Sequence, residues 1–112
     1  MPVYLVAYDI TAKPRYDRRR VTDAEETNTD ERREGFRKGL FAVDHAAHKL
    51  SESAYMIESG QTVEAITEAL RPKVAQWDEF YVTALTEPLH GQGELLELET
   101  TTLRAWLAGR SR

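Results

Sequence analysis

The sequence predicts one domain of the α+β class, because segments typical of strands alternate with segments of helical periodicity. Three segments are rich in β-branched and aromatic residues and are too short for helices: 3–10, 53–58 and 80–85. Between them, apolar residues recur at helical spacing over 36–50 and 63–74. The 112 residues have room for one hydrophobic core, so we expect a single domain over residues 1–112.

The three predicted strands are apolar on both faces. In the first strand, one face carries Val3, Leu5 and Ala7, and the other carries Tyr4, Val6 and Tyr8. Strands of this kind are typical of a sheet that is covered on both sides. Two helices cover only one side, so either the C-terminal tail or a second copy of the chain must cover the other. We expect a homodimer that buries this second face.

A long charged segment follows the first strand. Fourteen of the 25 residues in 11–35 are charged, seven of each sign. Few apolar side chains offset the entropy of ordering such a segment, so we expect an exposed excursion. Thr22 and Glu25 form a Thr-x-x-Glu capping pattern that predicts helical structure in its middle. The main helix is expected to begin near residue 30, capped by Thr29 or Asp30.

The remaining segments complete the predicted order of elements. Residues 48–50 either end the first helix or are already extended, Thr62 caps the second helix, and Pro72 ends or kinks it. The segment 94–107 fits a helix or a strand, so we interpret residues 94–112 as a C-terminal cap or arm. With right-handed crossovers, this order predicts a ferredoxin-like (split βαβ) sheet with two helices on one face, plus the charged insertion.

The composition limits the classes of protein to be considered. There are no cysteines, which excludes disulfides and thiolate metal sites. No apolar run approaches the roughly 18 residues that a membrane-spanning helix needs, so we expect a cytoplasmic protein without a membrane partner. The net charge is −4, whereas nucleic-acid-binding proteins usually carry an excess of basic residues. Nucleic-acid binding therefore requires a local basic patch.

One dense basic cluster is present in the charged segment. It consists of Arg15, Arg18, Arg19 and Arg20, with Lys13 and Tyr16 beside them. Such a cluster is able to bind the phosphates of nucleic acid. The simpler interpretation, which we favour, is a solvated run of charges that is neutralised by the acidic residues of segment 23–31.

Few other residues suggest a site. Asp9 ends the first strand, where its carboxylate either accepts hydrogen bonds from a turn or serves a function. His45 and His48 have a spacing that helical metal sites use, but on a helix they would face solvent without a third ligand, so we expect no metal there. Trp77 and Trp106 are interpreted as anchors of the core or of an interface.

Two motifs resemble a known family. They are Tyr8-Asp9-Ile10 at the end of the first strand and Ser53-Ala54-Tyr55-Met56-Ile57-Glu58 in the second. They are similar to the small ferredoxin-like proteins that include the dimeric CRISPR-associated nuclease subunit of the spacer-acquisition complex, the VapD ribonuclease toxins and the SinR-like hypothetical proteins. Segment 51–85, with a Thr-x-Glu helix start and Asp78-Glu79 before the last strand, resembles the SinR-like set.

The resemblance implies a function for Asp9. In this family, the carboxylate at that position faces its copy across a homodimer, and the pair holds a divalent metal for phosphodiester hydrolysis. Mg²⁺ suits such a site, because it prefers oxygen ligands and binds through one or two carboxylates plus water and phosphate. The resemblance thus implies a metal-dependent nuclease or a nucleic-acid-binding protein. For nucleic-acid binding, the candidate residues are those of the basic cluster, Arg15, Arg18, Arg19 and Arg20.

Two alternatives remain open. A protein of the same fold can be a non-catalytic interaction or scaffold module, which docks a protein partner on its sheet face and charged arm. It can also be a dimeric small-molecule binder that uses the space between the sheet and the helices. The acidic balance of the chain makes the interaction module nearly as good a hypothesis as the nuclease.

Overall fold

The structure is a computed structural model and describes residues 2–85. The elements in chain order are β1 (Val3–Asp9), α1 (Asp23–Val43), β2 (His48–Ser51), β3 (Ala54–Glu58), α2 (Val63–Leu70), the short 3₁₀ helix η1 (Arg71–Lys73) and β4 (Glu79–Leu85). This order confirms the predicted α+β class. The cap or arm expected at 94–112, which contains Trp106, lies outside the described residues.

The strands form one antiparallel sheet in the order β2-β3-β1-β4. The central strand β1 is paired on both sides, with Val3 opposite Glu58 of β3 and opposite Leu85 of β4. The extended segment expected at 48–50 is the edge strand β2, whose pairing with β3 is irregular between Lys49 and Ser51. The most apolar segment of the chain thus occupies the centre of the sheet.

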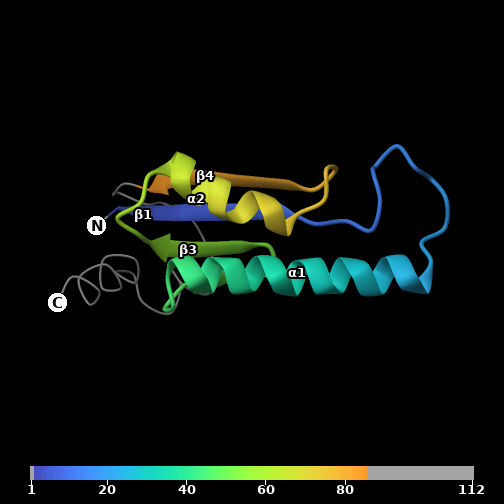
Figure 1. The fold of residues 1–112 in the computed structure, drawn as a ribbon, viewed down its shortest axis with the longest axis horizontal. Helices are drawn as coiled ribbons and strands as arrows, with labels where there is room; N and C mark the ends of the chain where they lie inside the picture. The colour runs from blue at the N-terminus through green and yellow to red at the C-terminus, as the bar shows by residue number, and fades with distance from the viewer. Residues whose placement is uncertain (1, 86–112) are drawn as a thin grey trace.

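Both helices pack on the same face of the sheet (Figure 1). Side chains alternate between the two faces of a strand, so Tyr4 and Val6 of β1 point to one side. They share a buried cluster with residues of α1, β3 and α2, namely Phe36, Leu40, Tyr55, Ile57, Ile66 and Leu70. The space between the sheet and the helices is therefore filled by one hydrophobic core.

The second face of the sheet has both buried and exposed apolar side chains. Val3 and Met56 point to this face and are buried. Tyr81 of the edge strand β4 points to the same face, opposite Ala7, and 65% of its surface is exposed. An exposed aromatic side chain on this second face agrees with the expectation that another surface covers it, and the homodimer stays a prediction.

Helix α1 begins at Asp23, so the predicted start near residue 30 is wrong. Thr22 is the cap: its hydroxyl accepts a hydrogen bond from the Glu25 amide, and the Glu25 carboxylate accepts one from the Thr22 amide, both at 3.1 Å. Glu and Arg are good helix formers, so a high charge density prevents burial of a segment without preventing helix formation. The irregular part of the predicted 11–35 excursion is therefore confined to residues 11–22.

Thr29 and Asp30 do not cap the helix, because both lie inside it. Thr29 is buried, and its hydroxyl donates to the carbonyl oxygen of Glu25 at 2.7 Å. At the other end, α1 stops at Val43, before both histidines. His45 lies in a turn and His48 in β2, so the helical spacing that their sequence positions suggested does not exist.

Helix α2 follows the prediction closely. Thr62 caps it, with its hydroxyl accepting a hydrogen bond from the Ala65 amide at 3.1 Å. The helix ends at Leu70, and Pro72 lies in the 3₁₀ turn that follows. Within residues 2–85, no helix is long and apolar enough to span a membrane.

Trp77 is an anchor, but it does not lie in the core. Its ring is 41% exposed, and its Nε1 donates to the carbonyl oxygen of Thr11 at 2.9 Å. The guanidinium of Arg32 lies 5.4 Å from the centre of the indole ring. Trp77 thus connects the segment before β4 to the start of the β1–α1 loop and to helix α1.

Candidate nucleic-acid interface and groove

Asp9 lies at the end of β1, with its side chain on the sheet face away from the helices, opposite Glu79 of β4. Its carboxylate is half exposed and pairs with Arg15, whose Nη2 donates to Oδ2 at 2.5 Å. This hydrogen bond and the nearby Glu79 carboxylate raise the pKa of Arg15. Asp9 is therefore held by an arginine side chain, a partner that neither of the two interpretations from the sequence included.

The metal expected at Asp9 has an incomplete set of ligands in one copy of the chain. Between residues 2 and 85, no group of three or more His, Asp or Glu side chains is placed to hold a metal ion. Mg²⁺ needs only one or two protein carboxylates, which a pair of Asp9 residues across a dimer would supply. The exposed position of Asp9 fits such a pairing, and the metal would have to displace Arg15.

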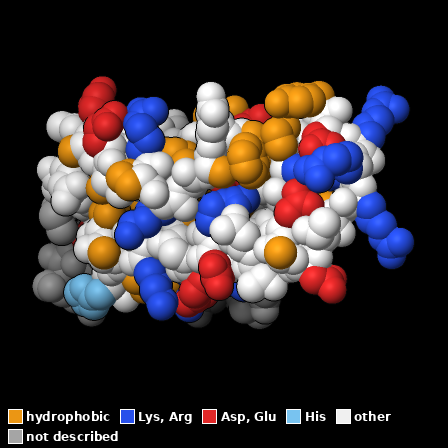
Figure 2. Space-filling view, turned by 45° about the vertical axis from the view of Figure 1, so that its right-hand side comes forward, with side chains coloured by type: hydrophobic (Ala, Val, Ile, Leu, Met, Phe, Trp, Pro, Cys, Tyr) orange, Lys and Arg blue, Asp and Glu red, His pale blue; other side chains and the backbone are white. Residues whose placement is uncertain are grey.

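The loop between β1 and α1 is positively charged, in contrast to the rest of the chain. Residues 11–22 contain five basic residues and one acidic residue, so their net charge is +4 (5 − 1) in a chain of net charge −4. The loop extends beyond the end of the sheet (Figure 1). Lys and Arg side chains project from the right-hand edge of the space-filling view (Figure 2).

The arginines of this loop differ in their partners. Arg15 pairs with Asp9, and Arg19 pairs with Asp17 and Glu25 at 2.9 and 3.2 Å. Arg18 and Arg20 are exposed, and neither forms an ion pair with any other described residue. The acidic segment 23–31 therefore neutralises only one of the four arginines.

Tyr16 lies in the same loop and is 87% exposed. An exposed aromatic ring among arginines is typical of surfaces on which nucleobases stack while the arginines contact phosphates. In the sequence, Tyr16 is visible only as a neighbour of the basic cluster. Its exposure follows from its place in an irregular loop, outside every strand and helix.

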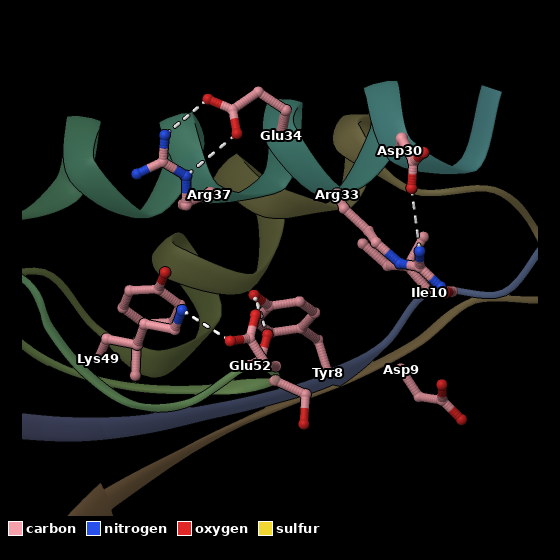
Figure 3. A pocket seen from close by; sticks show the side chains of 11 residues that line it. Tyr8, Asp9, Ile10, Asp30, Arg33, Glu34, Arg37, Lys49 and Glu52 are labelled. Atoms are coloured by element: carbon pink, nitrogen blue, oxygen red, sulfur yellow. Dashed lines mark hydrogen bonds and ion pairs between the residues drawn. The ribbon is translucent and has the colours of Figure 1, made fainter. Parts of the chain in front are cut away.

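A groove lies between α1 and the turn that joins β2 to β3 (Figure 3). Its volume is about 680 Å³. The residues that line it come from the end of β1, from one face of α1 and from the β2–β3 hairpin: Tyr8, Asp9, Ile10, Asp30, Arg33, Glu34, Arg37, Lys49, Glu52, Ser53 and Tyr55. The groove opens between the sheet and α1, where the alternative of a small-molecule binder placed its site, but the sequence did not indicate which residues line it.

Three ion pairs line the groove, each at i,i+3 spacing: two lie within α1, and the third joins β2 to the turn that follows it. Arg33 pairs with Asp30 at 3.1 Å, and Arg37 pairs with Glu34 through two hydrogen bonds of 2.7 and 3.1 Å. Lys49 pairs with Glu52 at 3.1 Å. Exposed pairs of this kind contribute little to stability, so their partners are exchanged easily.

Two tyrosines form part of the sheet side of the groove. Tyr8 and Tyr55 have nearly parallel rings, with centroids 6.4 Å apart. Burial is the main cause that raises the pKa of Tyr8, whose hydroxyl donates to the carbonyl oxygen of Glu52 at 3.0 Å. The Tyr55 ring is 2% exposed, and its hydroxyl has no hydrogen-bond partner in the described part of the chain.

The sequence matches no family model, and no curated protein shows significant similarity to it. The function is therefore inferred from the geometry of the loop and of the groove.

Proposed function

We propose that this protein is a ferredoxin-like homodimer that binds nucleic acid through its β1–α1 loop. The fold assignment is supported by the order strand–helix–strand–strand–helix–strand, together with the antiparallel sheet order β2-β3-β1-β4. The homodimer is supported by the apolar second face of the sheet, on which Tyr81 is exposed.

The unpaired guanidinium groups of Arg18 and Arg20 carry the proposal. Affinity for nucleic acid comes largely from contacts between basic side chains and phosphates, which release counterions. A guanidinium that already holds a carboxylate gains less from a phosphate, so Arg18 and Arg20 are better placed than Arg15 and Arg19. The rest of the chain has a net charge of −8 (−4 − 4), which repels phosphates and directs them to the loop.

Fluorescence anisotropy with labelled single-stranded RNA, single-stranded DNA and duplex DNA tests this proposal. We expect Arg18→Ala/Arg20→Ala to raise the Kd about tenfold. The slope of log K against log salt should decrease in magnitude by about 1.4, which is about 0.7 for each of the two lost phosphate contacts with a single strand. The matched control is Arg71→Ala/Lys73→Ala, which removes the same charge from η1. Tyr16→Ala is expected to weaken binding to single strands more than to duplex, because only unpaired bases are free to stack.

Two outcomes contradict the proposal. One is that the wild-type protein binds none of these nucleic acids at low salt. The other is that the control variant weakens binding as much as the loop variant. Either result would favour the alternative of a non-catalytic module that binds a protein partner.

Metal-dependent phosphodiester hydrolysis is a second candidate function. It is favoured by the half-exposed carboxylate of Asp9, which lies at a strand end on the open face where a second copy can bring its own Asp9. In such a dimer the two carboxylates would hold Mg²⁺, which polarises the phosphate and supplies a bound water as nucleophile. Cleavage of RNA and DNA with Mg²⁺ or Mn²⁺ tests this function. Asp9→Asn should abolish cleavage, and Asp23→Asn, which alters an exposed carboxylate of α1, should not.

A further inference from the structure

The groove between α1 and the β2–β3 hairpin is separate from the exposed arginines of the loop, and it gathers hydrogen-bond donors from three elements. Arg37 projects from α1, Lys49 from β2, and Tyr55 from β3. Arg37 and Lys49 approach from opposite walls, as the close view shows (Figure 3). Small-molecule sites are typically concave and combine aromatic surface with a few convergent polar groups.

We propose that this groove binds a phosphate monoester, carried either by a free nucleotide or by the end of a nucleic-acid strand. The second source rests on the proposed nucleic-acid binding, whereas the first does not. The volume of about 680 Å³ lies within the range of about 300–1,000 Å³ that is usual for small-molecule sites.

Unused donors are available in the groove. Arg37 directs Nε and Nη2 to Glu34, which leaves Nη1 free. Lys49 makes one hydrogen bond, to Glu52, and an ammonium has three protons to donate. The Tyr55 hydroxyl has no partner in residues 2–85, although its ring is almost completely buried. A buried side chain whose polar atom reaches a groove without a partner is a position at which a ligand acceptor fits.

The number of cations favours a phosphate over a carboxylate. A phosphate monoester carries a charge of about −1.5 to −2 at neutral pH and offers three acceptor oxygens. Arg33, Arg37 and Lys49 surround the groove, and a dianion interacts with several of them at once. The planar guanidinium of arginine also matches two phosphate oxygens, which makes a bidentate contact favourable.

The acidic residues of the groove compete with such a ligand. Asp30, Glu34 and Glu52 each neutralise one cation, and Asp9 at the end of the groove is held by Arg15. Each of the three groove pairs lies within one wall, either α1 or the β2–β3 hairpin, so the carboxylates keep the cations in position without joining the two walls. A phosphate takes the place of these carboxylates when it binds. Removing a carboxylate should therefore strengthen phosphate binding, which is an unusual consequence for the loss of an ion pair.

Isothermal titration calorimetry with adenosine monophosphate and adenosine tests the free-nucleotide source. We expect adenosine monophosphate to bind and adenosine to bind at least tenfold more weakly. Arg37→Gln should weaken the binding of adenosine monophosphate about tenfold, and Tyr55→Phe should weaken it without unfolding the protein. Glu34→Gln should strengthen it about threefold.

The matched control is Glu68→Gln. Glu68 forms the same i,i+3 pair with Arg71, at 3.0 Å, but it lies on α2 away from the groove, so its loss should leave nucleotide binding unchanged. The proposal is overturned if adenosine and its monophosphate bind equally, or if neither binds at about 1 mM and strand ends fail as well. It is also overturned if Glu34→Gln and Glu68→Gln have the same effect.

Anisotropy with 5′-phosphorylated, 3′-phosphorylated and unphosphorylated oligonucleotides tests the strand-end source. A terminal phosphate should strengthen binding severalfold in the wild-type protein, and Arg37→Gln should remove this difference. If only adenosine monophosphate responds to the groove variants, the ligand is a free nucleotide. The loop variant Arg18→Ala/Arg20→Ala should leave the binding of adenosine monophosphate unchanged, so the groove and the nucleic-acid proposal are able to fail independently.

Discussion

Arg32 of α1 and Asp78, which precedes β4, form an ion pair of 3.3 Å in which the Asp78 side chain is completely buried. Asp78 also accepts hydrogen bonds from the amides of Thr11 and Ala75, at 3.1 and 2.7 Å. Arg32 in turn donates to the carbonyl oxygen of Thr11 at 2.6 Å. Thr11, at the start of the basic loop, is thus fixed to α1 and to the segment before β4, which are both distant in the sequence.

Loss of the Asp78 carboxylate should destabilise the protein strongly. Asp78→Ala leaves Arg32 and two amides without their buried acceptor, so we expect a decrease of about 3 kcal/mol in the free energy of unfolding. Urea denaturation followed by circular dichroism measures this value. Glu68→Ala breaks an exposed pair and should have little effect. Equal effects of the two substitutions would show that the buried network does not stabilise the fold.

The capping box of α1 gives a second prediction. Thr22→Ala removes the acceptor for the Glu25 amide and should lower the free energy of unfolding by about 1 kcal/mol. Amide exchange should become faster in the first turns of α1, near residues 26–30. Thr62→Ala, which removes the cap of α2, should instead accelerate exchange in 66–70. Exchange near 26–30 that is fast in the wild type and unchanged by Thr22→Ala would contradict a helix start at Asp23.

The environment of Tyr8 predicts a dependence of stability on pH. Burial raises the pKa of this phenol in the folded state above its ordinary value of about 10, so the folded state binds the phenolic proton more tightly than the unfolded state. The stabilisation from Tyr8 is fully present below about pH 10 and is lost as the pH rises through the folded-state pKa.

Urea midpoints measured from neutral pH to above about pH 10 test this effect. Tyr8→Phe removes the titrating group, so its stability should fall less steeply with pH than that of the wild type. The loss of the hydrogen bond to Glu52 lowers the stability of this variant at every pH, and only the change of slope reports the pKa. Parallel curves for the two proteins would contradict the prediction.

The open face of the sheet predicts a dimer in solution. Light scattering should give twice the monomer mass, and Tyr81→Glu should shift the protein toward monomer by placing a charge in the interface. Tyr16→Glu, at an even more exposed tyrosine in the loop, should not affect the dimer. A monomeric wild-type protein at high concentration would remove the basis for pairing Asp9 across the interface.

A metal at paired Asp9 residues would alter the melting temperature. Binding to the folded dimer alone raises it by mass action, so Mg²⁺ or Mn²⁺ should stabilise the wild type and leave Asp9→Asn unchanged. Arg15→Ala frees the Asp9 carboxylate and should increase the effect of the metal. Without metal, Asp9→Asn should not lower stability, because it removes the repulsion between two carboxylates across the dimer. If metal has no effect on any of the three proteins, Asp9 is a structural partner of Arg15.

Local sequence patterns predicted the class and the order of the elements correctly. They succeed where the contacts that form an element join residues close together in the chain. Thr62 caps α2 through an amide three residues away, and the Thr22–Glu25 pattern marks a helix start in the same way. The start of α1 was misplaced because the charge of residues 23–29 was interpreted as a sign of exposed irregular chain. These residues are exposed on one side of a helix, and Phe36 and Leu40 further along anchor that helix in the core.

The candidate sites also have one part that the sequence shows and one part that only the tertiary structure shows. The composition of the basic cluster is visible in the sequence, but which arginine stays unpaired depends on where the chain places Asp9, Asp17 and Glu25. The groove depends even more on the tertiary structure, since it brings Tyr8, Arg37 and Lys49 together from three separate elements. By itself, the sequence determined three of the four strands, the order of the elements and the cap of α2, because the contacts that decide them span a few residues. Which charged groups meet was decided only by the packing of the elements on the sheet. Contacts between distant segments leave no repeating pattern in a single sequence, so the sequence cannot predict them.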